Sequence, residues 1–221
     1  MAHKAVVLVE MVKTADKPKI SDNPGASYQP IENYGIIGDL NTVALIGMNG
    51  AIDFLCFPDF DSPSLFAALL DKDKGGSYCI RPATGDFKSK QLYLPETNIL
   101  LTRFLSDKGI GEITDFMPVQ ELNRGNELIR RVTTVKGSIT YHLNCSPRFN
   151  YGLSPHTTHK ENAHQLSFTC KEAGFRLILK SNRKLEVDTQ DGVATFTLKA
   201  GQSADFILLY EGKYLPHNRD L

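Results

Sequence analysis

The residues best placed for chemistry lie in one short segment. Asp59 and Asp61 flank Phe60, and alternate side chains of an extended segment point to the same side. Two such carboxylates can hold a divalent cation, which would suit a metal-dependent sugar transferase. The motif is only three residues long, and Asp61 is better explained as a residue that satisfies free N–H groups at a helix start. We therefore expect neither a metal site nor a cofactor here.

Three histidines form a second candidate metal site. His156, His159 and His164 follow Pro155 in a polar stretch, and imidazoles at such spacing can bind metal. The stretch has the character of a hairpin loop in which nothing fixes the ring nitrogens. We interpret it as a solvated loop, with no metal.

Two adjacent arginines occupy a strand-like run. The side chains of Arg130 and Arg131 must point to opposite faces of a strand. We expect one of them to pair with a carboxylate such as Asp115 inside the fold, and the other to face a partner surface.

The remaining reactive residues carry no catalytic pattern. Cys56, Cys79, Cys145 and Cys170 are far apart and form no C-x-x-C pair, so we expect buried thiols and no disulfide framework. The sequence has no G-x-G-x-x-G, G-x-x-x-x-G-K-[ST], H-E-x-x-H or G-x-S-x-G motif. No catalytic residue is assigned.

Composition excludes some partners. With 25 Lys and Arg against 25 Asp and Glu, the chain lacks the positive field that binds nucleic acid. No apolar run reaches the roughly 18 to 20 residues of a membrane span, and the apolar start is too short for a signal peptide. We expect a cytoplasmic protein. The absence of Trp makes an independent carbohydrate-binding module less favoured, although eight Tyr keep it open.

The N-terminal part predicts an arm, a hairpin and one helix. Residues 1–33 read as a flexible arm. Thr42–Met48 and Ala51–Phe57 are β-rich runs separated by Asn49-Gly50, which favours a type I′ turn. Ser62 as N-cap and Pro63 at the first helical position predict a short helix that ends at Asp71.

The rest of the sequence predicts strand after strand. Residues 138–146, 165–170 and 193–199 alternate apolar and polar side chains, and Ala204–Tyr210 is apolar on both faces, as in a central strand packed on each side. Turn dipeptides include Lys136-Gly137 and Ala200-Gly201. About ten to twelve strands in this pattern predict an all-β fold, a large antiparallel β-sandwich over residues 34–212 with one short helix.

Several blocks carry a family resemblance. Ile37–Ile46 and Asn49–Asp71 resemble the opening of glycoside hydrolase family 15 proteins, the glucoamylase-like and trehalase-like enzymes. Further similar blocks follow in the family's order, at Thr114–Pro118, Leu128–Val132 and Pro147–Gly152. Three positions depart from the family pattern: Phe54, Asp59 and Asn150 stand where the family often has Trp, Arg and Asp.

The resemblance implies an N-terminal β-sandwich, a linker and an (α/α)6 barrel that carries two catalytic glutamates. It implies that residues 213–221 begin the linker, that this chain is the non-catalytic sandwich domain of an inverting α-glycoside hydrolase, and that its partners are the barrel and, through it, an α-glucan or trehalose. A homodimer is a further expectation. The alternatives are an independent carbohydrate-binding module and a sugar transferase using Asp59 and Asp61.

One segment is predicted to meet the barrel. Pro58 and Pro63 stiffen the turn after the second β-rich run, and Ser62 fixes its end. We expect the substrate-pocket rim or barrel interface to comprise Phe57, Pro58, Asp59, Phe60, Asp61 and Ser62.

Overall fold

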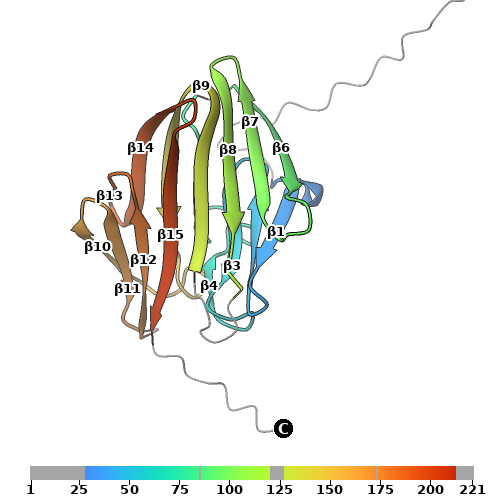
Figure 1. Ribbon diagram of the computed structural model, residues 1–221. Helices are drawn as coiled ribbons and strands as arrows, with labels where there is room; N and C mark the ends of the chain where they lie inside the picture. The colour runs from blue at the N-terminus through green and yellow to red at the C-terminus, as the bar shows by residue number, and fades with distance from the viewer. Residues whose placement is uncertain (1–27, 85, 120–126, 173, 213–221) are drawn as a thin grey trace, which may run out of the picture.

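The protein is a two-layer β-sandwich built around one long strand. The computed structural model describes residues 28–84, 86–119, 127–172 and 174–212 (Figure 1). Strand β9 (Glu127–Ser146) belongs to both layers. Its first half pairs with β8 and β15, and its second half pairs with β5 and β14.

All the strand pairs are antiparallel, and each layer runs outward from β9. The first sheet contains, besides the second half of β9, the strands β1 (Tyr34–Gly38), β2 (Val43–Gly47), β3 (Ala51–Cys56), β4 (Ser64–Phe66), β5 (Ser77–Pro82), β13 (Glu186–Asp188) and β14 (Asp191–Lys199). The second sheet contains, besides the first half of β9, the strands β6 (Lys88–Tyr93), β7 (Leu100–Ser106), β8 (Gly109–Phe116), β10 (Thr157–Asn162), β11 (Gln165–Cys170), β12 (Phe175–Ser181) and β15 (Ser203–Gly212). A short 3-10 helix, η1 (Ile31–Asn33), precedes β1.

Alternation of side chains explains why these strands form and where the core lies. Strands β8 and β14 bury every second residue, as expected when one face packs on the opposite sheet. Strand β15 is central, between β9 and β12, but it also alternates. The prediction that both of its faces are packed was therefore wrong, since only one face meets the other layer. The predicted all-β antiparallel fold is confirmed.

The predicted helix is absent and its residues form β4 with a turn. Ser64, Leu65 and Phe66 are all fully buried, whereas a helix of this length would bury only one stripe. Pairing of β4 with β3 overrides the local capping signal. The Ala67 N–H then donates to the Gly75 carbonyl (2.8 Å), so the chain folds back on itself.

Two predicted turns differ in detail. Of Asn49 and Gly50, only Gly50 has positive φ (81°), and its N–H donates to the Gly47 carbonyl (2.9 Å). The hairpin exists, but its turn is not type I′, which needs two such residues. Lys136-Gly137, by contrast, does not reverse the chain, because β9 continues through it. Gly137 (φ 78°) lies where β9 passes from one sheet to the other, and its left-handed backbone provides the bend.

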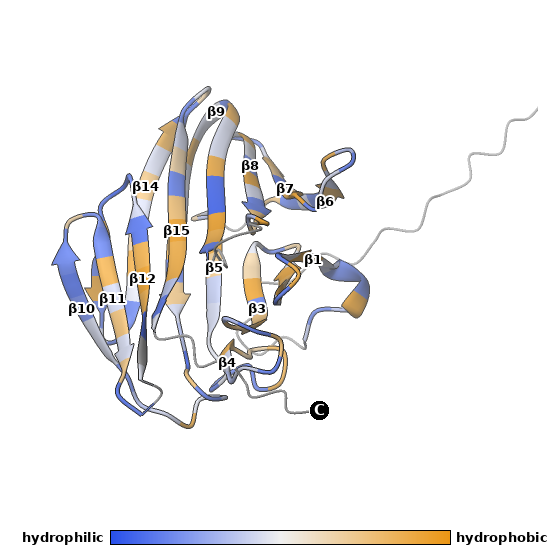
Figure 2. Ribbon diagram, turned by 60° about the horizontal axis from the view of Figure 1, so that its bottom comes forward, coloured by the Kyte–Doolittle hydropathy of each residue, from blue (hydrophilic) through white to orange (hydrophobic). Residues whose placement is uncertain are grey.

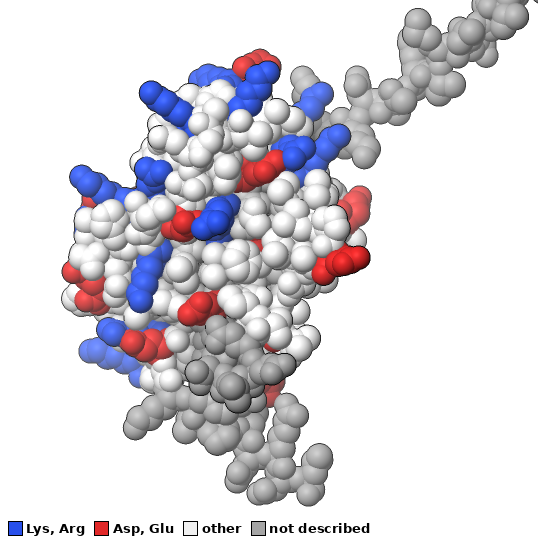
Figure 3. All heavy atoms as spheres, in the orientation of Figure 1, with Lys and Arg blue, Asp and Glu red and all other residues white. Residues whose placement is uncertain are grey.

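Positive and negative side chains are interspersed over the face seen in Figure 3. Within the described ranges, no helical segment has the length and hydropathy that crossing a membrane requires. Most of the predicted arm (residues 1–33) and all of the predicted linker (residues 213–221) lie outside the described residues.

Candidate functional site

The segment predicted to meet another domain connects β3 with β4 at one end of the sandwich. Phe57 is buried (1% exposed) and packs edge-to-face on Tyr210 of β15, with 6.1 Å between ring centroids. The Phe57–Pro58 peptide is cis. The segment is therefore anchored in the core beside the final residues of the last strand.

The exposed part of this segment is a tight turn. The Ser62 hydroxyl accepts a hydrogen bond from the Asp59 N–H (3.1 Å), and the Ser62 N–H donates to the Asp59 carbonyl (3.1 Å). Ser62 thus closes a local turn and does not cap a helix. Phe60 stands at its tip with 58% of its surface exposed.

Residues 39–42 form the first neighbouring loop. The Asn41 carbonyl accepts a hydrogen bond from the Phe60 N–H (2.9 Å), and the Thr42 hydroxyl donates to the Cys56 carbonyl. Within this loop one carboxylate oxygen of the buried Asp39 accepts both the Asn41 and Thr42 N–H groups (2.9 Å each). The loop is therefore fixed internally and tied to residues 56–60.

Residues 147–154 form the second neighbouring loop. The Asn150 N–H donates to the Ser64 carbonyl (3.0 Å), and the Tyr151 N–H donates to the Ser64 hydroxyl (3.1 Å). We call residues 39–42, 57–63 and 147–154 together the three-loop end. Figure 2 turns this end of the sandwich, around β3 and β4, toward the viewer.

The electrostatics of the three-loop end do not create a nucleophile. Burial raises the pKa of the Cys56 thiol, although an interaction with Tyr151 opposes that shift, so the thiol stays protonated at neutral pH. Burial, and then the charge of nearby Asp59, raise the pKa of the Tyr210 hydroxyl. Both groups stay uncharged, which suits a surface for contact more than one for reaction.

The residues considered as candidate metal ligands do not form a cluster. Among the described residues, no three His, Cys, Asp or Glu side chains lie close enough to hold a metal ion. His159 lies on β10, and the His164 Nδ1–H donates to the Arg183 carbonyl (3.1 Å). His156 is buried, not solvated as predicted, because it packs between the rings of Phe149 and Phe168.

The cysteine and arginine predictions are confirmed in most respects. All four cysteines are free, and Cys56, Cys145 and Cys170 are buried while Cys79 is half-buried. Arg130 pairs with Asp115 inside the sandwich (2.8 Å), as predicted. Arg131 points outward and pairs with Asp205 (2.6 Å).

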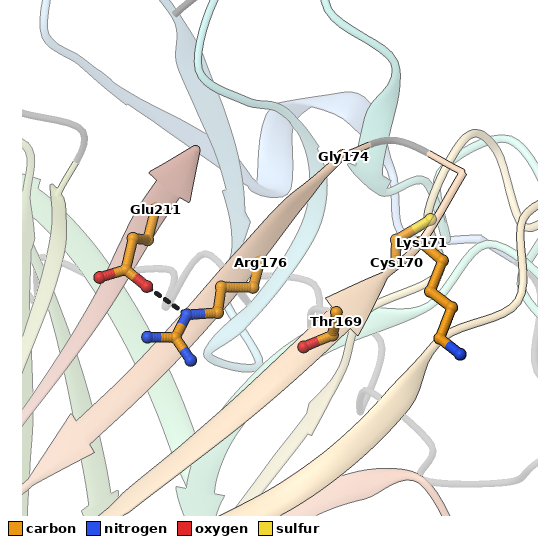
Figure 4. Close-up of a pocket in the computed structure, with 6 residues that line it drawn as sticks. All are labelled: Thr169, Cys170, Lys171, Gly174, Arg176 and Glu211. Atoms are coloured by element: carbon orange, nitrogen blue, oxygen red, sulfur yellow. Dashed lines mark hydrogen bonds and ion pairs between the residues drawn. The ribbon is translucent and has the colours of Figure 1, made fainter. Parts of the chain in front are cut away.

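A shallow hollow lies at the ends of β11, β12 and β15 (Figure 4). Its volume is about 280 Å³, and it is lined by Thr169, Cys170, Lys171, Gly174, Arg176 and Glu211. The Arg176 guanidinium is hydrogen-bonded to the Glu211 carboxylate, so the two charges engage each other. The hollow carries no pair of carboxylates poised for acid and base catalysis.

Sequence reasoning missed the two loops that flank the predicted segment. Leu40 (φ 76°), Asn150 (φ 52°), Tyr151 (φ 56°) and Gly152 (φ 78°) have left-handed backbones there. Asn and Gly are the residues that adopt this conformation most readily, so the pair around Tyr151 was the one available signal. No local signal marked Leu40.

Comparison with known proteins finds relatives of this chain among trehalases. Residues 23–201 match the family model described as trehalase-like, N-terminal. The chain is 36% identical over 159 residues to a trehalase of Thermoplasma volcanium, a match that covers 70% of this chain and 26% of that protein. It is 45% identical over 119 residues to trehalase 1 of Sulfolobus acidocaldarius, covering 54% of this chain and 20% of that protein.

A less similar relative is also matched over only a small share of its length. A trehalase of Mycolicibacterium smegmatis is 28% identical over 141 residues, covering 56% of this chain and 21% of that protein. The matches thus span about a fifth to a quarter of the length of these curated relatives.

Proposed function

This chain belongs to the trehalase-like N-terminal domain family, and we propose that it is a non-catalytic β-sandwich domain that packs on and shapes a catalytic barrel of the same protein. The parent protein would be an inverting α-glycoside hydrolase of the glycoside hydrolase family 15 type, acting on trehalose or an α-glucan. The names of the relatives favour trehalose.

One contact carries this proposal. Tyr210, near the end of β15, packs on Phe57, which begins the predicted interface segment. The last described residues of β15 therefore lie beside that segment, and the sequence continues beyond them. A domain attached there is held at high effective concentration next to residues 57–62, because a short connection turns docking into an intramolecular step.

In our proposal, the catalytic step belongs to the barrel. Inverting hydrolysis needs a carboxylic acid and a carboxylate on opposite sides of the scissile bond, with room for a water molecule. In our proposal the barrel supplies that pair. The sandwich contributes rigid contact through Phe57, Pro58, Asp59, Phe60, Asp61 and Ser62, of which Phe60 and Asp61 are exposed.

The complete open reading frame provides the test. We expect its product to hydrolyse trehalose or an α-glucan, and Phe60→Ala with Asp61→Ala to lower kcat/KM about tenfold, a change equivalent to about 1.4 kcal/mol. Leu92→Ala, in an exposed position of β6, is the matched control.

Two results would overturn the proposal. One is a reading frame that stops after the codon for Leu221. The other is a purified 221-residue chain that turns over trehalose, maltose or starch by itself, with that activity lost on Asp59→Ala or Asp61→Ala, which would favour the transferase-like alternative.

A further inference from the structure

We propose that the whole three-loop end is one preorganised docking surface, with Leu40, Phe60, Tyr151 and Leu153 as apolar anchors. Its occupant is the polypeptide that continues beyond residue 212. This inference rests on the proposed function, and it extends the interface from the single segment 57–62 to all three loops.

Exposure of large apolar side chains is the first observation. Leu40 is 83% exposed, Phe60 58%, Tyr151 49% and Leu153 78%. One or more of these side chains comes from each of the three loops, and the loops are hydrogen-bonded neighbours. Single exposed apolar residues are ordinary, but several gathered on adjoining loops mark an interaction site.

Rigidity is the second observation. Hydrogen bonds at both ends of residues 57–63 link the loops, since the Cys56 carbonyl accepts the Thr42 hydroxyl and the Ser64 hydroxyl accepts the Tyr151 N–H (3.1 Å). The Phe60 N–H binds the Asn41 carbonyl (2.9 Å). Anchors held in this way lose little conformational entropy on binding, so more of the contact energy remains for affinity.

Backbone strain is the third observation. Leu40 and Tyr151 hold left-handed backbones (φ 76° and 56°), which glycine would adopt without strain. Most of the Leu40 surface is also exposed to water, so its side chain contributes little to the stability of the isolated domain. Strained, exposed residues of this kind cluster at binding sites.

The position of β15 identifies the occupant. Tyr210 contacts Phe57, so the polypeptide beyond residue 212 starts at the same end of the sandwich. The matched relatives devote roughly three quarters or more of their length to sequence outside the match. A tethered domain pays far less association entropy than a second copy arriving from solution.

Hydrogen exchange of the complete open-reading-frame product tests the inference. Compared with the 221-residue chain, we expect backbone amides of residues 39–42 and 150–154 to exchange at least tenfold more slowly in the complete product. The double variant Leu40→Ser, Leu153→Ser should abolish that protection. Leu92→Ser, an exposed substitution on β6, should preserve it, and the 221-residue forms of both variants should keep the parent melting temperature.

The outcomes separate this inference from the proposed function. Protection that survives the double variant, together with loss of kcat/KM in Phe60→Ala, overturns the three-loop surface and leaves the single-segment interface in place. Equal exchange in the two wild-type proteins overturns the surface as well. Protection that appears in the 221-residue chain only at high concentration assigns the surface to a second copy and overturns the tethered occupant.

Discussion

At the scale of single residues, Arg130 joins the two layers from inside the core. Its guanidinium bonds Asp115 (2.8 Å) in the second sheet, and the Tyr78 (2.6 Å) and Gly50 (2.8 Å) carbonyls on the side of the first sheet. The pair is fully buried, and its burial cost is offset only while every donor keeps its acceptor. Arg131, its neighbour in sequence, makes an exposed pair instead.

This contrast gives a matched prediction. Asp115→Asn should lower the free energy of unfolding by about 3–5 kcal/mol, because it leaves the Arg130 charge uncompensated in the core. Asp205→Asn, which breaks the exposed pair, should change it by less than about 1 kcal/mol. Urea titration followed by circular dichroism measures both. Similar losses in the two variants would show that the buried pair has no special weight.

His156 predicts a pH dependence. Burial lowers its pKa from the ordinary 6.5, and its Nε2 bonds the Gln190 carbonyl (3.2 Å). The unfolded chain therefore binds a proton at higher pH than the folded chain does, so stability is lost as the pH falls below about 6.5. The nearby Arg148 and Asp191 form an ion pair (2.8 Å) whose charges act in opposite directions on the His156 pKa, since Arg148 lowers it and Asp191 raises it.

Replacement of this side chain tests the dependence. His156→Gln should reduce the drop in melting temperature between about pH 7 and pH 5, even if it lowers the melting temperature at both. His159→Gln, at an exposed position of β10, should leave the drop unchanged. An identical drop in wild type and His156→Gln would exclude His156 as its source.

At the scale of elements, local pattern predicts strands and fails where distant contacts decide. The alternation in residues 138–146 and 193–199 is a local consequence of one buried face, and both runs are strands. The prediction of a helix at Pro63–Asp71 was wrong because β4 pairs with β3 and its Ser64 carbonyl accepts the N–H of residue 150. The loop cluster is equally non-local, since Ser64 and Tyr151 are 87 positions apart.

Leu40 provides the prediction for a loop. Leu40→Gly should raise the free energy of unfolding of the 221-residue chain by several tenths up to about 1 kcal/mol, because it relieves the left-handed strain and removes few contacts. Leu92→Gly, within a strand, should lower it by about 0.5–1 kcal/mol. Urea midpoints compare the two. Destabilisation by Leu40→Gly would indicate that the Leu40 side chain supports the fold itself.

At the scale of the whole molecule, β9 makes the two layers one cooperative unit. Residues 127–133 pair with β15 and residues 138–145 pair with β14, so neither sheet keeps its central strand if the other unravels. At Gly137, where β9 passes between the sheets, the backbone of Lys108 approaches closely. A Cβ on Gly137 would lie 2.0 Å from the Lys108 carbonyl oxygen.

Gly137→Ala should therefore destabilise both sheets together. We expect a loss of at least about 2 kcal/mol, because backbone strain adds to a clash that only main-chain movement can relieve. Gly201→Ala is the matched control, since Gly201 has a similar φ (81°) but nothing within 4 Å of its Cβ position, and it should cost only about 1 kcal/mol. Native-state hydrogen exchange, measured in β3 of the first sheet and β12 of the second, shows whether the two sheets unfold together or independently. Faster exchange by the same factor in both strands is the expected result of a shared β9, whereas acceleration confined to one sheet would mean that the layers unfold independently.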